Sequence, residues 1–174
     1  GQFALQDDPL VGARESGSLQ INWLGYSCEA SADLLGIGVG GISQIGTLQL
    51  QNRRDLASYQ MQLANDQLAT FHGHHSSAQE QLQSALSEAL LCDLQVDLQA
   101  LEASFGELSR DYMSACRPAL EQMAADGLLQ LTPQALSILP AGRLLVGAVC
   151  KVLEQGRTEP AATQRRFGTL SAMP

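Results

Sequence analysis

The stretch that most constrains the fold runs from Trp23 to Gly46, and its second half alternates glycine with branched apolar residues. Five glycines fall within eleven residues here: Gly36, Gly38, Gly40, Gly41 and Gly46. Apolar residues at every second position predict a buried strand over residues 35–45. Glycine weakens a strand and gathers where another backbone or a ligand comes close. The pattern therefore predicts a ligand-facing sheet edge, with tight packing of strand against helix as the alternative.

Helical patterns dominate the rest of the chain. Alternating apolar and polar residues predict one strand over 19–26, before the glycine-rich stretch. A helix is predicted over 52–68, and the composition of 69–77 predicts a loop. Apolar spacing with glycine and proline signals predicts the later elements, which are helices over 78–92, 96–104, 107–126 and 141–155 and a hairpin over 128–139. Pro118 lies inside one of these helices and predicts a kink or a restart there.

Three helices, a hairpin and a final helix form a winged-helix-like outline. In nucleic-acid binders this outline places basic side chains on the recognition helix. The longest predicted helix carries Arg110 and Arg117 among acidic residues, and the net charge of the chain is −8. Because such a chain repels phosphate backbones, we expect no nucleic-acid partner.

The bulk composition predicts a folded cytoplasmic protein with a real core. The chain has 174 residues, 45% of them apolar, and no apolar run approaches the length that spans a bilayer, so we expect no membrane contact. Its four cysteines are widely spaced and form no CxxC pair: Cys28, Cys92, Cys116 and Cys150. We therefore expect reduced, mostly buried thiols.

Several short motifs in a fixed order resemble one enzyme family. They include Gly25-Tyr26, Asp33-Leu34-Leu35-Gly36-Ile37-Gly38, Ile42-Ser43, Ile45-Gly46, Gln51-Asn52, Leu90-Leu91-Cys92, Asp126-Gly127-Leu128 and Gly142-Arg143-Leu144-Leu145. In this order they resemble the C-terminal part of oxygen-independent coproporphyrinogen III oxidases, which are radical S-adenosylmethionine (SAM) enzymes of haem biosynthesis. The resemblance covers most of the chain.

The resemblance implies a mostly helical α+β fold. It assigns residues 1–47 to the last strand or strands of a TIM-like radical SAM barrel and 48–76 to a connecting helix and loop. Residues 77–156 then form a helical, winged-helix-like C-terminal domain with a small β-hairpin, and 157–174 form a tail. The implied partners are an N-terminal radical SAM domain of the same protein and a tetrapyrrole substrate. A homodimer through an open sheet edge near 35–45 is a further expectation.

The resemblance also implies which residues face the cofactor. Ile42 matches an isoleucine that contacts a second SAM, and Gly25, Gly36 and Gly38 would line the same side. Leu24 stands where the family has a glutamine, and its side chain can form no hydrogen bond. The family's arginines before and after the core leucines are also replaced, so the chain could come from a divergent paralogue.

Catalysis in the family begins at a CxxxCxxC motif that binds a [4Fe–4S] cluster. The chain has no such motif, so we expect it to bind no cofactor and to be inactive alone. In this interpretation it closes the barrel and covers the substrate of an oxidoreductase. The alternative is a non-catalytic paralogue or binding module that holds haem, another tetrapyrrole or a protein.

Two polar clusters have both functional and structural explanations. His72, His74 and His75 lie within four residues and could bind zinc or nickel, although a solvated loop also explains them. Asp93 and Asp97 are spaced as paired carboxylates, although acids at a helix N-terminus are the commoner explanation.

Overall fold

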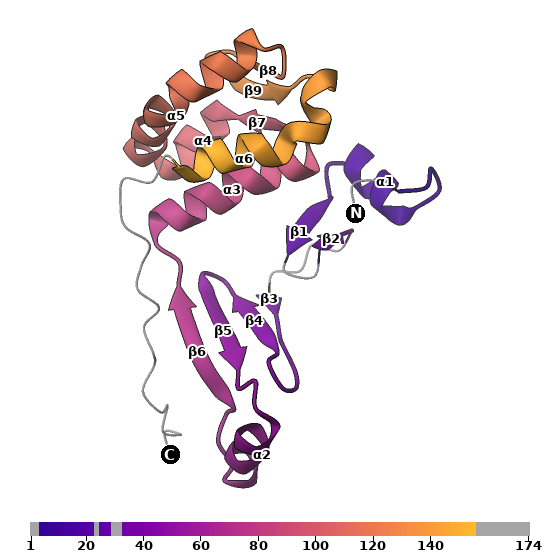
Figure 1. Cartoon of the computed structure of the whole chain (residues 1–174), viewed down its shortest axis with the longest axis vertical. Helices are drawn as coiled ribbons and strands as arrows, with labels where there is room; N and C mark the ends of the chain where they lie inside the picture. Colours follow the sequence, from indigo (N-terminus) through magenta and orange to yellow (C-terminus); the bar gives the residue numbers. More distant parts are fainter. Residues whose placement is uncertain (1–3, 23–24, 29–32, 156–174) are drawn as a thin grey trace. The chain divides into compact units, whose positions relative to one another are not determined.

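The computed structural model of the chain describes residues 4–22, 25–28 and 33–155, which divide into two compact units (Figure 1). The first unit contains the described residues 4–22, 25–28 and 78–155, and the second contains residues 33–77. Both units are mixtures of helix and sheet, and the described strands form no closed barrel. None of the described helices is both long and apolar enough to span a membrane.

The first unit is mainly helical. Its helices are α1 (Pro9–Glu15), α3 (Ala78–Cys92), α4 (Leu98–Phe105), α5 (Glu107–Ala125), the 3₁₀ helix η1 (Pro140–Leu145) and α6 (Val146–Gln155). Its strands are β1 (Gln20–Asn22), β2 (Gly25–Ser27), β7 (Gln95–Asp97), β8 (Leu129–Leu131) and β9 (Ala135–Ile138). Strands β1 and β2 form an antiparallel pair, and the other three form an antiparallel sheet in the order β7-β9-β8. The helices predicted over 78–92 and 107–126 and the predicted hairpin are observed. Residues 95–97 form β7 in place of the start of the helix predicted over 96–104, and the helix predicted over 141–155 begins as the 3₁₀ helix η1.

One apolar core holds the first unit together. In α3, Leu82, Leu86 and Leu90 recur every fourth residue and are fully buried, as expected for one face of a helix. They pack with apolar side chains of α5, α6 and the small sheet. At the centre, the hydroxyl of Tyr112 donates to the carbonyl oxygen of Leu153 and accepts from the side-chain amide of Gln83 at 2.7 Å. The buried phenol thus joins α5 to α3 and α6.

Helix α5 runs unbroken through Pro118, so the predicted restart at this proline is wrong. Pro118 removes the hydrogen bond that the carbonyl of Ser114 would accept. Both residues lie on the exposed side of the helix, where water can replace the missing donor. The helix begins directly after Gly106, whose φ of 58° ends α4.

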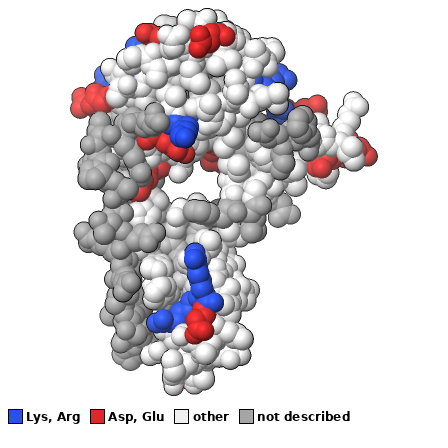
Figure 2. Space-filling model, viewed as in Figure 1, with Lys and Arg blue, Asp and Glu red and all other residues white. Residues whose placement is uncertain are grey.

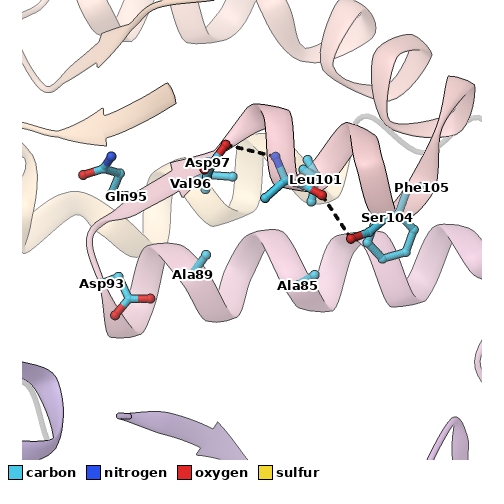
Figure 3. Close-up of a pocket in the computed structure, with 10 residues that line it drawn as sticks. Ala85, Ala89, Asp93, Gln95, Val96, Asp97, Leu101, Ser104 and Phe105 are labelled. Atoms are coloured by element: carbon cyan, nitrogen blue, oxygen red, sulfur yellow. Dashed lines mark hydrogen bonds between the residues drawn. The ribbon is translucent and has the colours of Figure 1, made fainter. Parts of the chain in front are cut away.

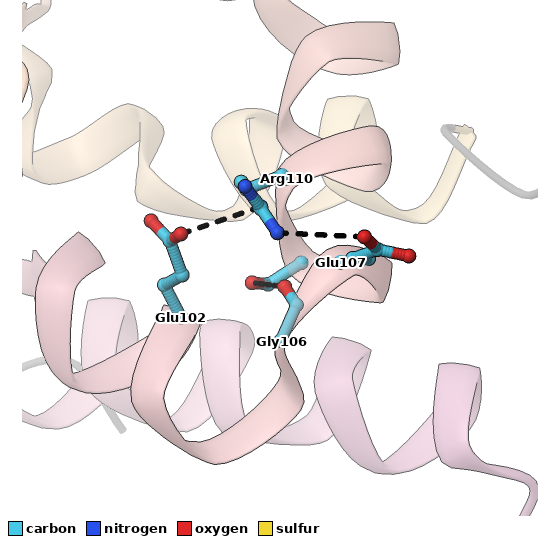
Figure 4. Close-up of polar contacts among 5 residues, drawn as sticks. Glu102, Gly106, Glu107 and Arg110 are labelled. Atoms are coloured by element: carbon cyan, nitrogen blue, oxygen red, sulfur yellow. Dashed lines mark hydrogen bonds and ion pairs between the residues drawn. The ribbon is translucent and has the colours of Figure 1, made fainter.

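Arg110 links the end of α4 to the start of α5. Its Nε lies 3.3 Å from a carboxylate oxygen of Glu102, and one terminal nitrogen lies 3.8 Å from Glu107 (Figure 4). All three side chains are at least half exposed, so these pairs stabilise the fold by less than about 1 kcal/mol. The pairing neutralises a cation that a DNA-reading helix would need.

Gly142 allows η1 to lie directly against the residue before β8. A Cβ at this position would lie 2.9 Å from the carbonyl carbon of Leu128 and closer still to its oxygen. The same oxygen accepts a hydrogen bond of 3.0 Å from the backbone N–H of Leu139. Only glycine permits this approach.

The second unit is a four-stranded antiparallel sheet with one short helix. Its strands are β3 (Asp33–Leu34), β4 (Ile42–Ile45), β5 (Leu48–Asn52) and β6 (Thr70–His75), and its helix is α2 (Leu56–Ala64). The order is β3-β4-β5-β6, so β3 and β6 are the edges. Asp55 begins α2 by accepting a hydrogen bond of 2.8 Å from the backbone N–H of Ser58.

Five predictions for residues 19–77 need correction. Residues 35–41 are a loop rather than a buried strand, because the glycines form a turn, and Ile37 is 92% exposed. Strand β4 pairs on both sides, so it cannot be the predicted open edge. The predicted loop 69–77 contains strand β6, since Thr70 and residues 72–75 pair with β5. The predicted strand 19–26 is a pair of antiparallel strands, and the helix over 52–68 is only nine residues long.

The second unit buries few large side chains. Among its described residues only Ala69 belongs to the buried apolar set. Large apolar side chains are instead exposed along the loop, α2 and the adjoining segment: Leu35, Ile37, Val39, Ile45, Leu56, Met61, Leu63, Leu68 and Phe71. Figure 2 shows this unit largely without charge, apart from one group of basic and acidic side chains. Exposed apolar surface of this extent is typical of a face that another part of a protein covers.

Candidate functional site

The glycine loop, residues 35–41, folds back against the start of β4. A Cβ on Gly36 would overlap the backbone nitrogen, carbon and oxygen of Ile42, and a Cβ on Gly41 would lie 2.8 Å from the carbonyl carbon of Gly36. The contact of backbone with backbone therefore requires glycine at both positions. Close packing within the chain explains these two glycines without a ligand.

Asn52 and its neighbours fix the shape of this loop. The side-chain amide of Asn52 donates to the carbonyl oxygens of Gly36 at 3.1 Å and Gly38 at 3.0 Å. The backbone of Arg53 accepts from the N–H of Gly40 at 2.8 Å, and the side chain of Gln51 donates to the carbonyl of Gly40 at 3.4 Å. The loop is held by β5, and it presents Leu35, Ile37 and Val39 to solvent in a defined conformation.

Strand register places polar side chains in a row with Ile42. Ile42 pairs with Gln51, and Gln51 pairs with His72, so these three side chains lie on one face of the sheet. The neighbouring row on the same face contains Gln44, Gln49 and His74. We call this face, defined by these six residues, the amide–imidazole face.

The predicted cofactor-binding residues fall in both units. Gly36, Gly38 and Ile42 lie together at the glycine loop of the second unit. Gly25 begins β2 in the first unit, with a φ of 121°. Leu24 lies outside the described residues. The structure therefore brings three of the five positions together, and their contact with a cofactor stays a prediction.

The histidines do not converge. His72 and His74 lie on the amide–imidazole face, while His75 points to the other face and has its Nε2 3.1 Å from the hydroxyl of Thr47. Within the described ranges, no three His, Cys, Asp or Glu side chains lie close enough to bind a metal ion. The zinc or nickel hypothesis thus gains no support.

A groove of about 490 Å³ in the first unit lies between α3 and the β7–α4 segment (Figure 3). Ala85, Ala89 and Ala100 line it together with Asp93 and Asp97. Asp97 caps α4 by accepting from the backbone N–H groups of the second and third residues that follow it, at 2.9 and 3.0 Å.

The i,i+4 carboxylate pair predicted from the sequence is not on a helix. Asp93 follows the C-terminal end of α3, whereas Asp97 ends β7. Because the Asp97 carboxylate is engaged in capping α4, general acid–base catalysis by the pair gains no support.

The thiols do not suit an iron–sulfur cluster. Cys92, Cys116 and Cys150 are buried, and burial raises the pKa of each, that of Cys92 to about 11. Cluster ligands must be thiolates that lie close together, and the described cysteines form no such group. A cluster would therefore have to be bound by residues outside this chain.

Sequence patterns missed Asn52, Gln51 and Arg53 as organisers of the loop. Their roles depend on which strand pairs with which, and a single sequence does not reveal this register. The Gln51-Asn52 pair was recognised only as a family motif.

The comparisons with known proteins point to one family. Residues 76–145 match the family described as the HemN C-terminal domain. An oxygen-independent coproporphyrinogen III oxidase of Pseudomonas aeruginosa is 39% identical over 165 residues, which cover 95% of this chain and 35% of the relative. The enzyme of the same name from Thermostichus vulcanus is 32% identical, over 87% of this chain and 47% of the relative.

A solved structure agrees with these relatives. Coproporphyrinogen III oxidase (HemN) from Escherichia coli, described as a radical SAM enzyme, matches with a TM-score of 0.80 and 30% identity. The match covers 87% of this chain and 35% of that one. The chain thus spans about a third of the length of the first curated relatives it matches.

Proposed function

We propose that the chain, whose residues 76–145 belong to the HemN C-terminal domain family, is the C-terminal part of an oxygen-independent coproporphyrinogen III oxidase. The observation that carries this proposal is the similarity to such oxidases over 95% of the chain. The parent protein would be a cytoplasmic oxidoreductase of haem biosynthesis. It would bind SAM and a [4Fe–4S] cluster through its N-terminal domain, because the cysteines of this chain do not suit a cluster.

The reaction of the parent would convert two propionates of coproporphyrinogen III to vinyl groups, giving protoporphyrinogen IX. Each propionate loses CO₂, one proton and two electrons. When bound by the N-terminal domain, the cofactors would supply the radical chemistry that removes one hydrogen atom, and a one-electron acceptor would take the remaining electron. The contribution of this chain is to bind and cover, not to start the chemistry.

In this proposal the two units have different roles. The second unit completes the barrel sheet, since its edge strands are open and its apolar side chains are exposed for contact with the N-terminal domain. The first unit, with its winged-helix-like order of helices and hairpin, covers the tetrapyrrole. Ile42 and the glycine loop face the cofactor side.

A homodimer is a weaker proposal than contact with the N-terminal domain. The strand on which it rested, β4, is flanked on both sides, so a second copy would have to pair with β3 or β6. A β3 edge of two residues offers few hydrogen bonds. β6 is the more suitable edge, and it is also the one that an N-terminal domain would use.

A non-catalytic paralogue is the second candidate. Leu24 in place of the family's glutamine favours it, because leucine cannot replace the hydrogen bond. The run Gln81-Leu82-Gln83 also stands where the family has an Arg-Arg-Asp run, so the arginines that could pair with propionates are lacking there.

Electron paramagnetic resonance of the reconstituted parent protein separates the two candidates. The oxidase proposal requires a reduced [4Fe–4S]⁺ signal that changes when SAM is added. Absence of a cluster signal would contradict the oxidase proposal and favour the binding module. A signal that changes with SAM but without consumption of coproporphyrinogen would indicate a paralogue with another substrate.

A further inference from the structure

Two basic side chains of the second unit lie against the same aromatic ring. The guanidinium carbon of Arg53 lies 5.0 Å from the centre of the Phe71 ring, and the His72 ring lies 4.1 Å from it in an edge-on arrangement. Stacking on an aromatic ring restricts a guanidinium without using its N–H donors. Arg53 and His72 thus both contact the ring of Phe71.

Neither basic group has an acceptor among the described residues. Nε of Arg53 and Nδ1 of His72 are buried atoms without a hydrogen-bond partner. Within the same residues no carboxylate lies within 4.0 Å of Arg53, since the ion pairs of the described part involve other arginines. Buried polar atoms without a partner destabilise a fold, so this arrangement calls for an explanation.

The outer nitrogens of both groups remain available to a ligand. The terminal nitrogens of Arg53 and Nε2 of His72 are absent from the buried unpartnered atoms and form no hydrogen bond within the described part, so they are open to solvent. A guanidinium fork and an imidazole N–H are suitable donors for a carboxylate.

Strand register connects this pair to the loop that carries the cofactor prediction. His72 lies in the same row as Gln51 and Ile42 on the amide–imidazole face. A carboxylate held by the pair would therefore lie on the same row as the residue that is predicted to contact SAM, with Gln51 between them. The carboxylate of Asp55 interacts electrostatically with Arg53, but the two form no ion pair within 4.0 Å, so a ligand carboxylate can still approach the guanidinium.

We propose that Arg53 and His72 form a carboxylate-binding pair, held in place by Phe71, on the amide–imidazole face. The inference rests on the proposed function for the source of the carboxylate. Both a propionate of the tetrapyrrole and the methionine carboxylate of SAM have this chemistry.

Binding of defined probes to the 174-residue chain tests the pair. Coproporphyrin III is titrated by fluorescence, with its tetramethyl ester as the probe without carboxylates, and SAM is titrated by calorimetry. The variants Arg53→Gln and His72→Gln are compared with Arg143→Gln, which removes an exposed arginine of the first unit, and His75→Gln, which alters the other face. Circular dichroism checks that each variant is folded, and Arg53→Lys retains the charge without the fork.

We expect each change in the pair to weaken binding of one probe about tenfold, with Arg53→Lys intermediate and both controls within twofold of the wild type. Loss confined to coproporphyrin identifies a propionate, and loss confined to SAM identifies the cofactor. Unchanged affinities in Arg53→Gln and His72→Gln, or equal losses in the two controls, would overturn the proposal. Binding of the ester as tight as that of the acid would also overturn it, as would a wild-type chain that binds neither probe.

The same variants in the parent protein distinguish failure of the pair from failure of the proposed function. If the parent protein with either variant forms the cluster and consumes coproporphyrinogen as well as the wild type does, the proposed function stands and only the carboxylate-binding pair is refuted. A parent protein without a cluster would contradict the oxidase proposal, whereas carboxylate-dependent binding by the chain would still support the carboxylate-binding pair.

Discussion

Replacing Gly142 by alanine is the sharpest test of how the first unit is assembled. The new Cβ would lie 2.9 Å from the carbonyl carbon of Leu128, and ordinary contact begins at 3.4 Å. The backbone must therefore move by at least about 0.5 Å, and by more at the oxygen. Overpacking of this kind costs roughly 1–3 kcal/mol. The movement also weakens the hydrogen bonds Leu139 N–H to Leu128 and Gly142 N–H to Leu139, each worth about 1 kcal/mol.

We expect Gly142→Ala to lower the free energy of unfolding by about 2–4 kcal/mol. With a urea dependence of roughly 2 kcal/mol per molar, the midpoint falls by about 1–2 M. Circular dichroism at the helix band follows the first unit, which contains every described helix except α2.

Gly147→Ala is the matched control. Gly147 lies inside α6, and a Cβ there meets nothing within 4 Å. Because alanine favours a helix interior over glycine, this variant should gain about 0.5–1 kcal/mol. A Gly142→Ala variant within about 0.5 kcal/mol of the wild type would refute the packing argument.

Four further predictions concern single contacts. Tyr112→Phe should destabilise the first unit by about 1–2 kcal/mol in urea unfolding, because it leaves the carbonyl of Leu153 without its donor, and Tyr59→Phe in α2 should not. Asn52→Ala should speed amide hydrogen exchange of the loop at residues 36–43 while α3 stays protected, because the variant loses the two hydrogen bonds from the Asn52 side chain to the loop. Equal protection of the loop in the variant and the wild type would contradict this role of Asn52. A maleimide should label Cys28 before the three buried thiols. Because burial raises the pKa of Cys92 from 9.0 to about 11, the unfolded chain loses this proton at a lower pH than the folded chain does. The free energy of unfolding should therefore fall as pH rises above about 9. Light scattering of the chain should give a monomer if the edge of β6 is reserved for the N-terminal domain, and a dimer would support pairing between copies.

Much of the first unit could be predicted from the sequence. Leu82, Leu86 and Leu90 recur at helical spacing, and Gly106 and Gly127 mark helix ends, so local signals and the final structure agree. The restart predicted at Pro118 is wrong because the proline lies on the side of the helix that faces water.

The second unit could not be predicted in the same way. Alternation of glycine with Leu35, Ile37 and Val39 is typical of a strand, yet backbone contact between Gly36 and Ile42 folds the segment into a loop. The strand over 70–75 contains three histidines and a glycine, and its pairing with β5 overrides this weak β-propensity. Both outcomes depend on contacts between residues distant in the sequence.

The same limit applies to the candidate site. The family resemblance indicated Ile42. Only the strand register shows that Gln51 and His72 lie in one row with it. Only the side-chain packing shows that Arg53 contacts Phe71. Motif reading finds residues near each other in sequence, whereas this face is assembled from three strands.

The central claim is that this chain serves an oxygen-independent coproporphyrinogen III oxidase, and anaerobic turnover of the reconstituted parent protein tests it most directly. Coproporphyrinogen III is supplied with SAM and a reductant, and the released CO₂ is measured together with the tetrapyrrole product. We expect two CO₂ for each protoporphyrinogen IX formed, with no activity when SAM is omitted. A reconstituted parent that holds its cluster and cleaves SAM but releases no CO₂ from coproporphyrinogen III would contradict the claim.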